Sequence, residues 1–77
     1  MPTLRRFGVV SLRIYADDHH PPHFHLVSAD FQVLVRLSDL AVIAGEARSA
    51  QIGEALAWAA QNREALALKW AELNMRG

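Results

Sequence analysis

All four histidines of the chain lie in one short segment, where two acids and two prolines accompany them. The segment reads Asp17-Asp18-His19-His20-Pro21-Pro22-His23-Phe24-His25. Imidazole titrates near neutral pH, binds metal ions and transfers protons in catalysis, and nearby carboxylates extend the same chemistry. We therefore expect any activity to involve this segment, and its candidate functional residues are Asp18, His19, His23 and His25.

Metal binding is the first chemistry that fits this cluster. If residues 23–25 are extended, His23 and His25 lie on one side of a strand, about 6.6 Å apart at about 3.3 Å per residue. They could share a divalent transition metal such as zinc or nickel, with His19 or Asp18 completing the site. The chain has no cysteine, which excludes a thiolate site.

Proton transfer is the second chemistry, and a purely structural role is the third. One histidine could act as general base and another as general acid while Arg13 or Arg36 steadies a phosphate, as in a metal-free ribonuclease. Alternatively, the histidines and Asp18 form a hydrogen-bonded network that holds the loop or a protein contact surface. The residue types leave the three readings open, and with them the choice between enzyme and binding protein.

Length and composition predict one small domain. With 77 residues, of which 52% are hydrophobic, residues 1–77 have room for a single compact unit. Eight basic and eight acidic residues cancel, which argues against strong non-specific binding to nucleic acid. The first six residues lack the apolar run of a signal peptide, and no stretch of about 18 apolar residues could span a bilayer. We expect a cytoplasmic protein without a membrane segment.

Residue preferences change near residue 41 and predict strands followed by helices. Valines end at Val42, whereas 11 of the 13 alanines lie in residues 41–77. Expected strands are Phe7 to Tyr15, with Gly8 hosting a bulge, then His23 to Val27, Phe31 to Leu37 and a brief fourth near Ala41 to Ile43. The prediction is an α+β fold: a small antiparallel sheet of three to four strands, about residues 7–43, followed by one broken or two consecutive C-terminal helices, about residues 49–75, packed on one face.

The helical half carries one apolar stripe that is too long for the predicted sheet. The stripe comprises Ile52, Leu56, Ala59, Arg63, Leu66, Trp70 and Leu73. An unbroken helix from Ser49 to Met75 would measure roughly 40 Å, whereas ordinary strands span about 17 to 20 Å. Either the helix breaks at Asn62-Arg63, or its far end pairs with a second copy in a homodimer. We favour the break, with Trp58 and Trp70 both in the core.

Side-chain alternation gives the histidines a direction. Phe24 and Leu26 belong inside, so His23 and His25 should point to the opposite face of the sheet. If the helices cover one face only, the other is exposed and carries Arg13, Tyr15, His23, His25, Gln32 and Arg36. Such a face suits a phosphate or single-stranded RNA, with Arg13, Tyr15 and Arg36 as contact residues. It could equally be the ordinary polar face of an antiparallel sheet.

Several motifs together resemble a known family. They are Pro2 to Gly8, Ile14-Tyr15, the run Asp18 to His25, Gly45, Trp58, Asn62-Arg63-Glu64, Leu66 and Trp70. On these residues the chain resembles the small bacterial family catalogued as domain of unknown function number 4160. It departs from that family in having His20 at a variable position and in Arg48 to Ala50, where relatives often carry proline.

The resemblance implies a compact α+β fold and a place in a toxin–antitoxin-like gene pair, whose partner protein is encoded nearby. It brings no established activity. We expect a small intracellular bacterial protein that uses the histidine loop and sheet face for contact with a partner, a metal or RNA. The alternative is a small histidine-dependent ribonuclease or metal-dependent hydrolase.

Overall fold

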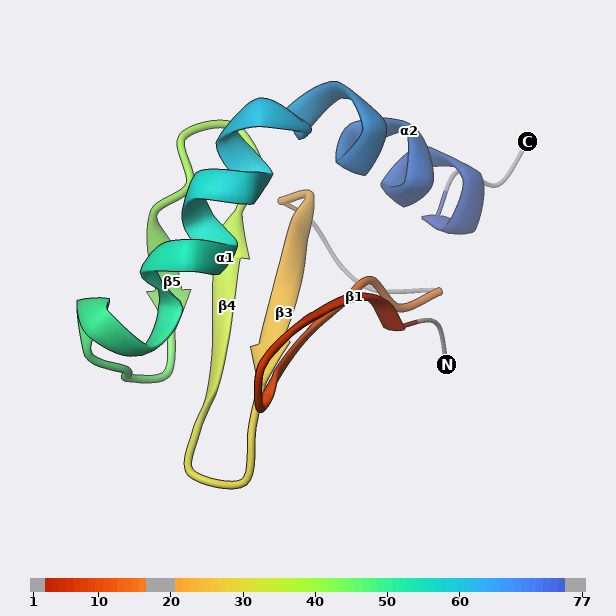
Figure 1. Ribbon diagram of the computed structural model, residues 1–77. Coiled ribbons are helices and arrows are strands. Elements are labelled where there is room, and N and C mark those ends of the chain that lie inside the picture. The colour runs from red at the N-terminus through yellow and green to blue at the C-terminus, as the bar shows by residue number, and fades with distance from the viewer. Residues whose placement is uncertain (1–2, 17–20, 75–77) are drawn as a thin grey trace.

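The computed structural model describes residues 3–16 and 21–74 (Figure 1). Five strands precede two helices along the chain. Their bounds are β1 Thr3–Phe7, β2 Val10–Arg13, β3 His23–Val27, β4 Gln32–Arg36, β5 Val42–Ala44, α1 Ser49–Gln61 and α2 Arg63–Asn74. The predicted order of strands and helices is confirmed. Within these described ranges, no helix has the length and apolar character needed to cross a membrane.

The strands form one antiparallel sheet in the order β1-β2-β3-β4-β5, so neighbours in sequence are neighbours in space. The sheet has five strands, where the sequence predicted three or four. The difference lies at Gly8, which was expected to form a bulge but has φ of 62° in the turn between β1 and β2. Glycine adopts this left-handed conformation without steric cost. The turn makes a hairpin and adds Thr3–Phe7 as an edge strand.

The strand register defines two faces of the sheet. Leu12 lies opposite Leu26, which lies opposite Val33, and all three are fully buried. On the other face, Arg13 lies opposite His25, which lies opposite Leu34. Directly opposed residues in a sheet share a face, so the histidines do point away from Leu26 as the alternation predicted.

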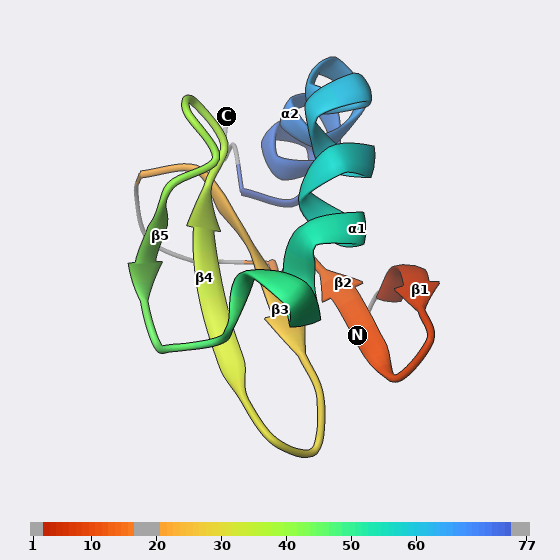
Figure 2. The ribbon, with the colours of Figure 1, turned by 60° about the vertical axis from the view of Figure 1, so that its left-hand side comes forward.

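The helices complete the core on the face of Leu26. Their buried residues are Ile52, Ala55 and Ala59 in α1 and Leu66 and Trp70 in α2. Figure 2 shows α1 against this face of the sheet, and Figure 1 shows α2 continuing past the end of the strands. Ala55 replaces Leu56 in the buried stripe, and Arg63 is exposed.

The predicted break between two helices lies at Asn62. The Asn62 side chain donates a hydrogen bond to the Trp58 carbonyl at 2.8 Å, and its backbone N–H donates to Ala59 at 3.1 Å. These bonds satisfy carbonyls at the end of α1 and tighten its last turn. The chain then turns into α2, and Trp70 reaches the core while Trp58 is half-buried against Phe7.

Candidate functional site

Four rings form a continuous row, which we call the ring row: Tyr15, His25, His23 and Trp70. The centroids of Tyr15 and His25 are 4.5 Å apart, those of His25 and His23 are 5.1 Å apart, and those of His23 and Trp70 are 5.0 Å apart. The first contact is edge to face at 84°, and the other two are tilted. These are ordinary packing geometries for rings. The row links the segment that follows β2, the first half of β3 and α2.

Polar partners fix the orientation of each imidazole. The Nδ1 of His23 donates to the Pro21 carbonyl at 2.7 Å, because a carbonyl oxygen can only accept. The Nδ1 of His25 accepts from the Gln32 side-chain amide at 3.2 Å. In its neutral form, His23 therefore carries its proton on Nδ1, whereas His25 carries its proton on Nε2.

The expectation that His23 and His25 lie on an exposed face is wrong. His23 is 1% exposed and His25 is 8% exposed. Their direction was predicted correctly, but the face is covered at this end, because Tyr15 and Trp70 pack at the two ends of the histidine pair. Alternation along one strand predicts which side a residue faces, whereas contacts with distant segments decide whether that side is open to solvent.

The residues expected to contact RNA or an anion are spread over different environments. Arg13 is half-buried, and its Nε is buried without a hydrogen-bond partner. Tyr15 is half-buried with its ring against His25. Arg36 is paired with Asp39 through two hydrogen bonds of 3.0 and 2.8 Å. The structure therefore brings Arg13 and Tyr15 close to His25, whereas the guanidinium of Arg36 points to the carboxylate of Asp39.

Only some of the predicted metal ligands lie among the residues that the structure describes. His23 and His25 are adjacent, but Asp18 and His19 lie outside the described residues. Across residues 3–16 and 21–74, no three histidine or acidic side chains come together as a metal site would require. A donor bond from Nδ1 to a backbone carbonyl, as His23 makes, is common in metal-binding histidines but also in purely structural ones.

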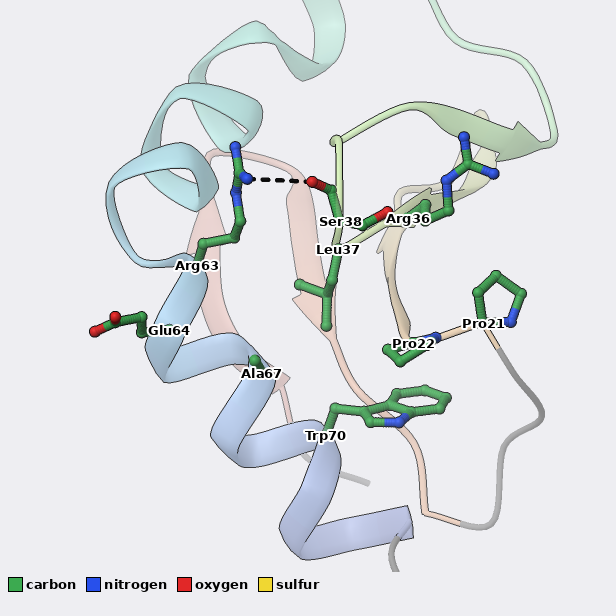
Figure 3. Close-up of a pocket in the computed structure, with 9 residues that line it drawn as sticks. All are labelled: Pro21, Pro22, Arg36, Leu37, Ser38, Arg63, Glu64, Ala67 and Trp70. Atoms are coloured by element: carbon green, nitrogen blue, oxygen red, sulfur yellow. Dashed lines mark hydrogen bonds between the residues drawn. The ribbon is translucent and has the colours of Figure 1, made fainter.

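A groove that the sequence did not predict lies beside the ring row (Figure 3). Its volume is about 390 Å³. The lining residues are Pro21, Pro22, Arg36, Leu37, Ser38, Arg63, Glu64, Ala67 and Trp70. Trp70 belongs to both features, because its indole lines the groove and also contacts His23. We call this feature the Pro22–Trp70 groove.

Three separate segments build the groove. Pro21 and Pro22 lead into β3, Leu37 follows β4, and Ala67 and Trp70 lie on α2. The backbone N–H of Leu37 donates to the Pro22 carbonyl at 3.0 Å and so joins two of the walls. From the sequence, Arg36 was expected to contact an anion and Trp70 to lie in the core, but no groove was predicted, because no spacing relates these segments to one another.

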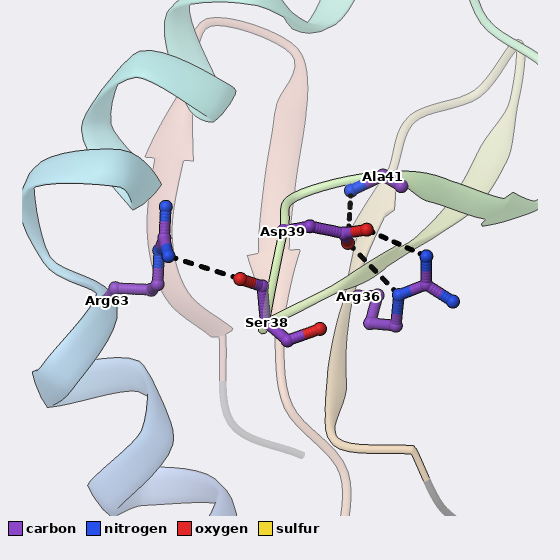
Figure 4. A network of polar contacts seen from close by, with 5 residues as sticks. All are labelled: Arg36, Ser38, Asp39, Ala41 and Arg63. Carbon is purple, nitrogen blue, oxygen red and sulfur yellow. Dashed lines mark hydrogen bonds and ion pairs between the residues drawn. The ribbon is translucent and has the colours of Figure 1, made fainter.

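Polar contacts organise one end of the groove (Figure 4). Arg36 and Asp39 form a forked ion pair, and Asp39 also accepts from the Ala41 backbone at 3.1 Å. The hydrogen bond from Arg36, together with the bond from Ala41, lowers the pKa of Asp39 from 3.8 to about 2. The same pair raises the pKa of Arg36. Arg63 reaches across from α2 and donates to the Ser38 carbonyl at 3.2 Å.

The fold and site define a small α+β protein with a five-stranded antiparallel sheet, two helices, a buried histidine pair and an apolar groove. A family model described as domain of unknown function (DUF4160) matches residues 10–71. The chain belongs to this family, as its motifs indicated. No curated protein and no solved structure matches the chain.

Proposed function

We propose that this protein is a non-enzymatic binding module, a member of a toxin–antitoxin-like pair in the bacterial cytoplasm, and that it binds its partner protein through the Pro22–Trp70 groove. The observation that carries the proposal is the groove itself, because an apolar hollow of about 390 Å³ with a few polar groups at one end is typical of a binding site. The family resemblance supports a partner encoded nearby.

The ring row supports a binding role for this region. Trp70 can hold a fixed position in the groove because His23 packs against its other side. His23 is in turn held by the Pro21 carbonyl, and Pro21 belongs to the opposite wall. The histidine therefore connects two walls of the groove, which keeps the groove open and preorganised for a ligand.

The burial of the histidines favours binding over the ribonuclease or hydrolase alternative. A general base must approach the proton that it removes to about 2.6 to 3.2 Å. His23 and His25 are almost completely buried, and each Nδ1 already has a hydrogen-bond partner. Purified protein should accordingly leave RNA intact. Cleavage that disappears in His23→Ala would overturn the proposal.

Two variants of α2 provide a direct test of groove binding. Ala67 lines the groove and is exposed, whereas Ala65 is exposed on the same helix but does not line it. Ala67→Arg should fill the groove without disturbing the core, and Ala65→Arg is the matched control. The chain is coexpressed with the product of the neighbouring gene, and the complex is measured by size-exclusion chromatography and calorimetry.

We expect the complex to form with the unmodified chain and with Ala65→Arg, and to weaken at least tenfold with Ala67→Arg. Circular dichroism should show that both variants remain folded. Equal binding by both variants would place the partner elsewhere on the protein. Absence of any complex with the unmodified chain would overturn the proposed pairing.

A further inference from the structure

The floor of the Pro22–Trp70 groove is apolar and rigid. Leu37 and Trp70 are almost fully buried in the protein yet contribute surface to the groove, and Pro22 is half-buried. Proline fixes its own backbone φ angle, and Trp70 is held from behind by His23. The walls therefore have little freedom to close over the hollow, and an apolar side chain from a ligand can fill it.

The two arginines at the end of the groove differ in whether a carboxylate neutralises their charge. The guanidinium of Arg36 is neutralised by Asp39 in a forked pair. Arg63 has only the neutral carbonyl of Ser38 as its partner among the residues that the structure describes. A guanidinium has five N–H donors, so most of those on Arg63 remain available to a ligand.

Glu64 does not supply the missing negative charge inside the groove. Although it lines the groove, its carboxylate points away from Leu37 and Trp70 in Figure 3, on the outer side of α2. Arg63 instead extends toward Ser38, across the end of the hollow. Within the described part of the chain, an approaching ligand therefore meets an apolar floor flanked by the available positive charge of Arg63.

We propose that the groove binds a short acidic peptide segment in which a carboxylate lies next to an aliphatic or aromatic side chain. The apolar side chain would lie between Leu37, Ala67 and Trp70, and the carboxylate would accept two hydrogen bonds from Arg63. Charge-assisted forked bonds of this kind are stronger than neutral ones and add geometric specificity. The inference rests on the proposed function and names the chemistry of the partner segment.

The groove fits a peptide better than it fits a nucleic acid. Binding along a phosphate backbone depends on several cations that each neutralise a phosphate. Here, among the described residues, Arg63 has no carboxylate partner and adjoins an apolar floor built from proline, leucine, alanine and tryptophan. A basic segment would be repelled by Arg63, so an acidic segment is the complementary one.

The test uses a random dodecapeptide library displayed on phage and selected on the immobilised full chain. Each round includes counter-selection on Ala67→Arg, so that only peptides that need the groove survive. We expect survivors to carry Asp or Glu within three residues of Leu, Ile, Phe or Trp. The best peptide is then synthesised, together with a copy in which its acid is replaced by the amide, and binding to both is measured by calorimetry.

Variants of Arg63 test whether the peptide needs its carboxylate, independently of whether it binds in the groove. Arg63→Gln should weaken binding of the acidic peptide at least tenfold and leave binding of the amide peptide unchanged. Arg63→Lys, which keeps the charge but loses the forked geometry, should give an intermediate loss. Thermal unfolding confirms that each variant is folded at the temperature of the measurement.

The outcomes distinguish the two proposals. Two results would overturn the proposal that the ligand is acidic and still leave the groove as the docking site. The first is recovery of groove-dependent peptides that lack an acid. The second is an Arg63→Gln variant that binds the acid and amide peptides as the unmodified chain does. Failure to recover any peptide that discriminates against Ala67→Arg would overturn peptide binding at the groove, whereas docking of the whole partner protein is decided by the complex with Ala67→Arg.

Discussion

The indole of Trp70 packs against the imidazole of His23, with ring centroids 5.0 Å apart and ring planes inclined by 50°. This contact joins α2 to the first residue of β3, which lie 47 positions apart in the sequence (70 minus 23). It also places the buried histidine pair directly behind the Pro22–Trp70 groove. The stability of the fold and the shape of the candidate site therefore depend on the same tryptophan.

Replacing Trp70 should destabilise the protein strongly. Trp70 is 4% exposed, and deletion of a buried tryptophan side chain to alanine typically costs about 3 to 5 kcal/mol. Trp70→Phe should cost less, because a ring can still pack against His23. Urea unfolding followed by circular dichroism measures both changes. A loss below about 1 kcal/mol in Trp70→Ala would contradict the packing described here.

Two glycines should respond oppositely to alanine. Gly45 has φ of 81°, and an added Cβ would overlap the backbone carbonyl of Gln32, so Gly45→Ala should destabilise the protein. Gly53 lies inside α1 with open space around its Cα, and Gly53→Ala should stabilise the helix by about 0.5 to 1 kcal/mol. Thermal unfolding of the two variants should show shifts of opposite sign. Stabilisation by Gly45→Ala would argue against the position of Gly45 beside β4, and destabilisation by Gly53→Ala would argue against open space at Gly53.

The ion pair between Arg36 and Asp39 should be detectable by titration at low pH. The pKa of Asp39 falls from 3.8 to about 2 in the folded protein, so the contribution of the pair is present above pH 3.8 and disappears as the pH falls toward 2. Titration of the Asp39 carboxyl by NMR should give a midpoint near the lower value. In Arg36→Gln the midpoint should return toward 3.8. An ordinary midpoint in the unmodified protein would show that the forked pair does not form in solution.

Arg5 should hold the edge strand β1 against α1. Its guanidinium lies 5.7 Å from the centre of the Phe7 ring and 5.3 Å from that of Trp58. Exposed contacts of this kind contribute about 0.5 to 1 kcal/mol. Arg5→Gln should therefore cost a measurable part of that amount in the unmodified protein and less in a Trp58→Leu background. Equal costs in a double-mutant cycle would mean that the cation does not interact with Trp58.

Much of the fold could be predicted from local sequence patterns. The change from valine-rich to alanine-rich composition predicted strands before helices, and the Asn62-Arg63 break followed from comparing helix length with strand length. Gly8 was misjudged because a positive φ suits a bulge and a tight turn equally well, and only pairing with Thr3–Phe7 distinguishes them. The motifs around the histidine segment were enough to predict the family.

By itself, the sequence determined which side of β3 carries His23 and His25, because alternation along a strand is a local property of the backbone. Only the tertiary structure decided that both imidazoles are buried, since Tyr15 and Trp70 reach them from segments whose positions no local pattern specifies. The Pro22–Trp70 groove has the same origin. Its walls come from three parts of the chain, and their meeting depends on how α2 packs against the end of the sheet.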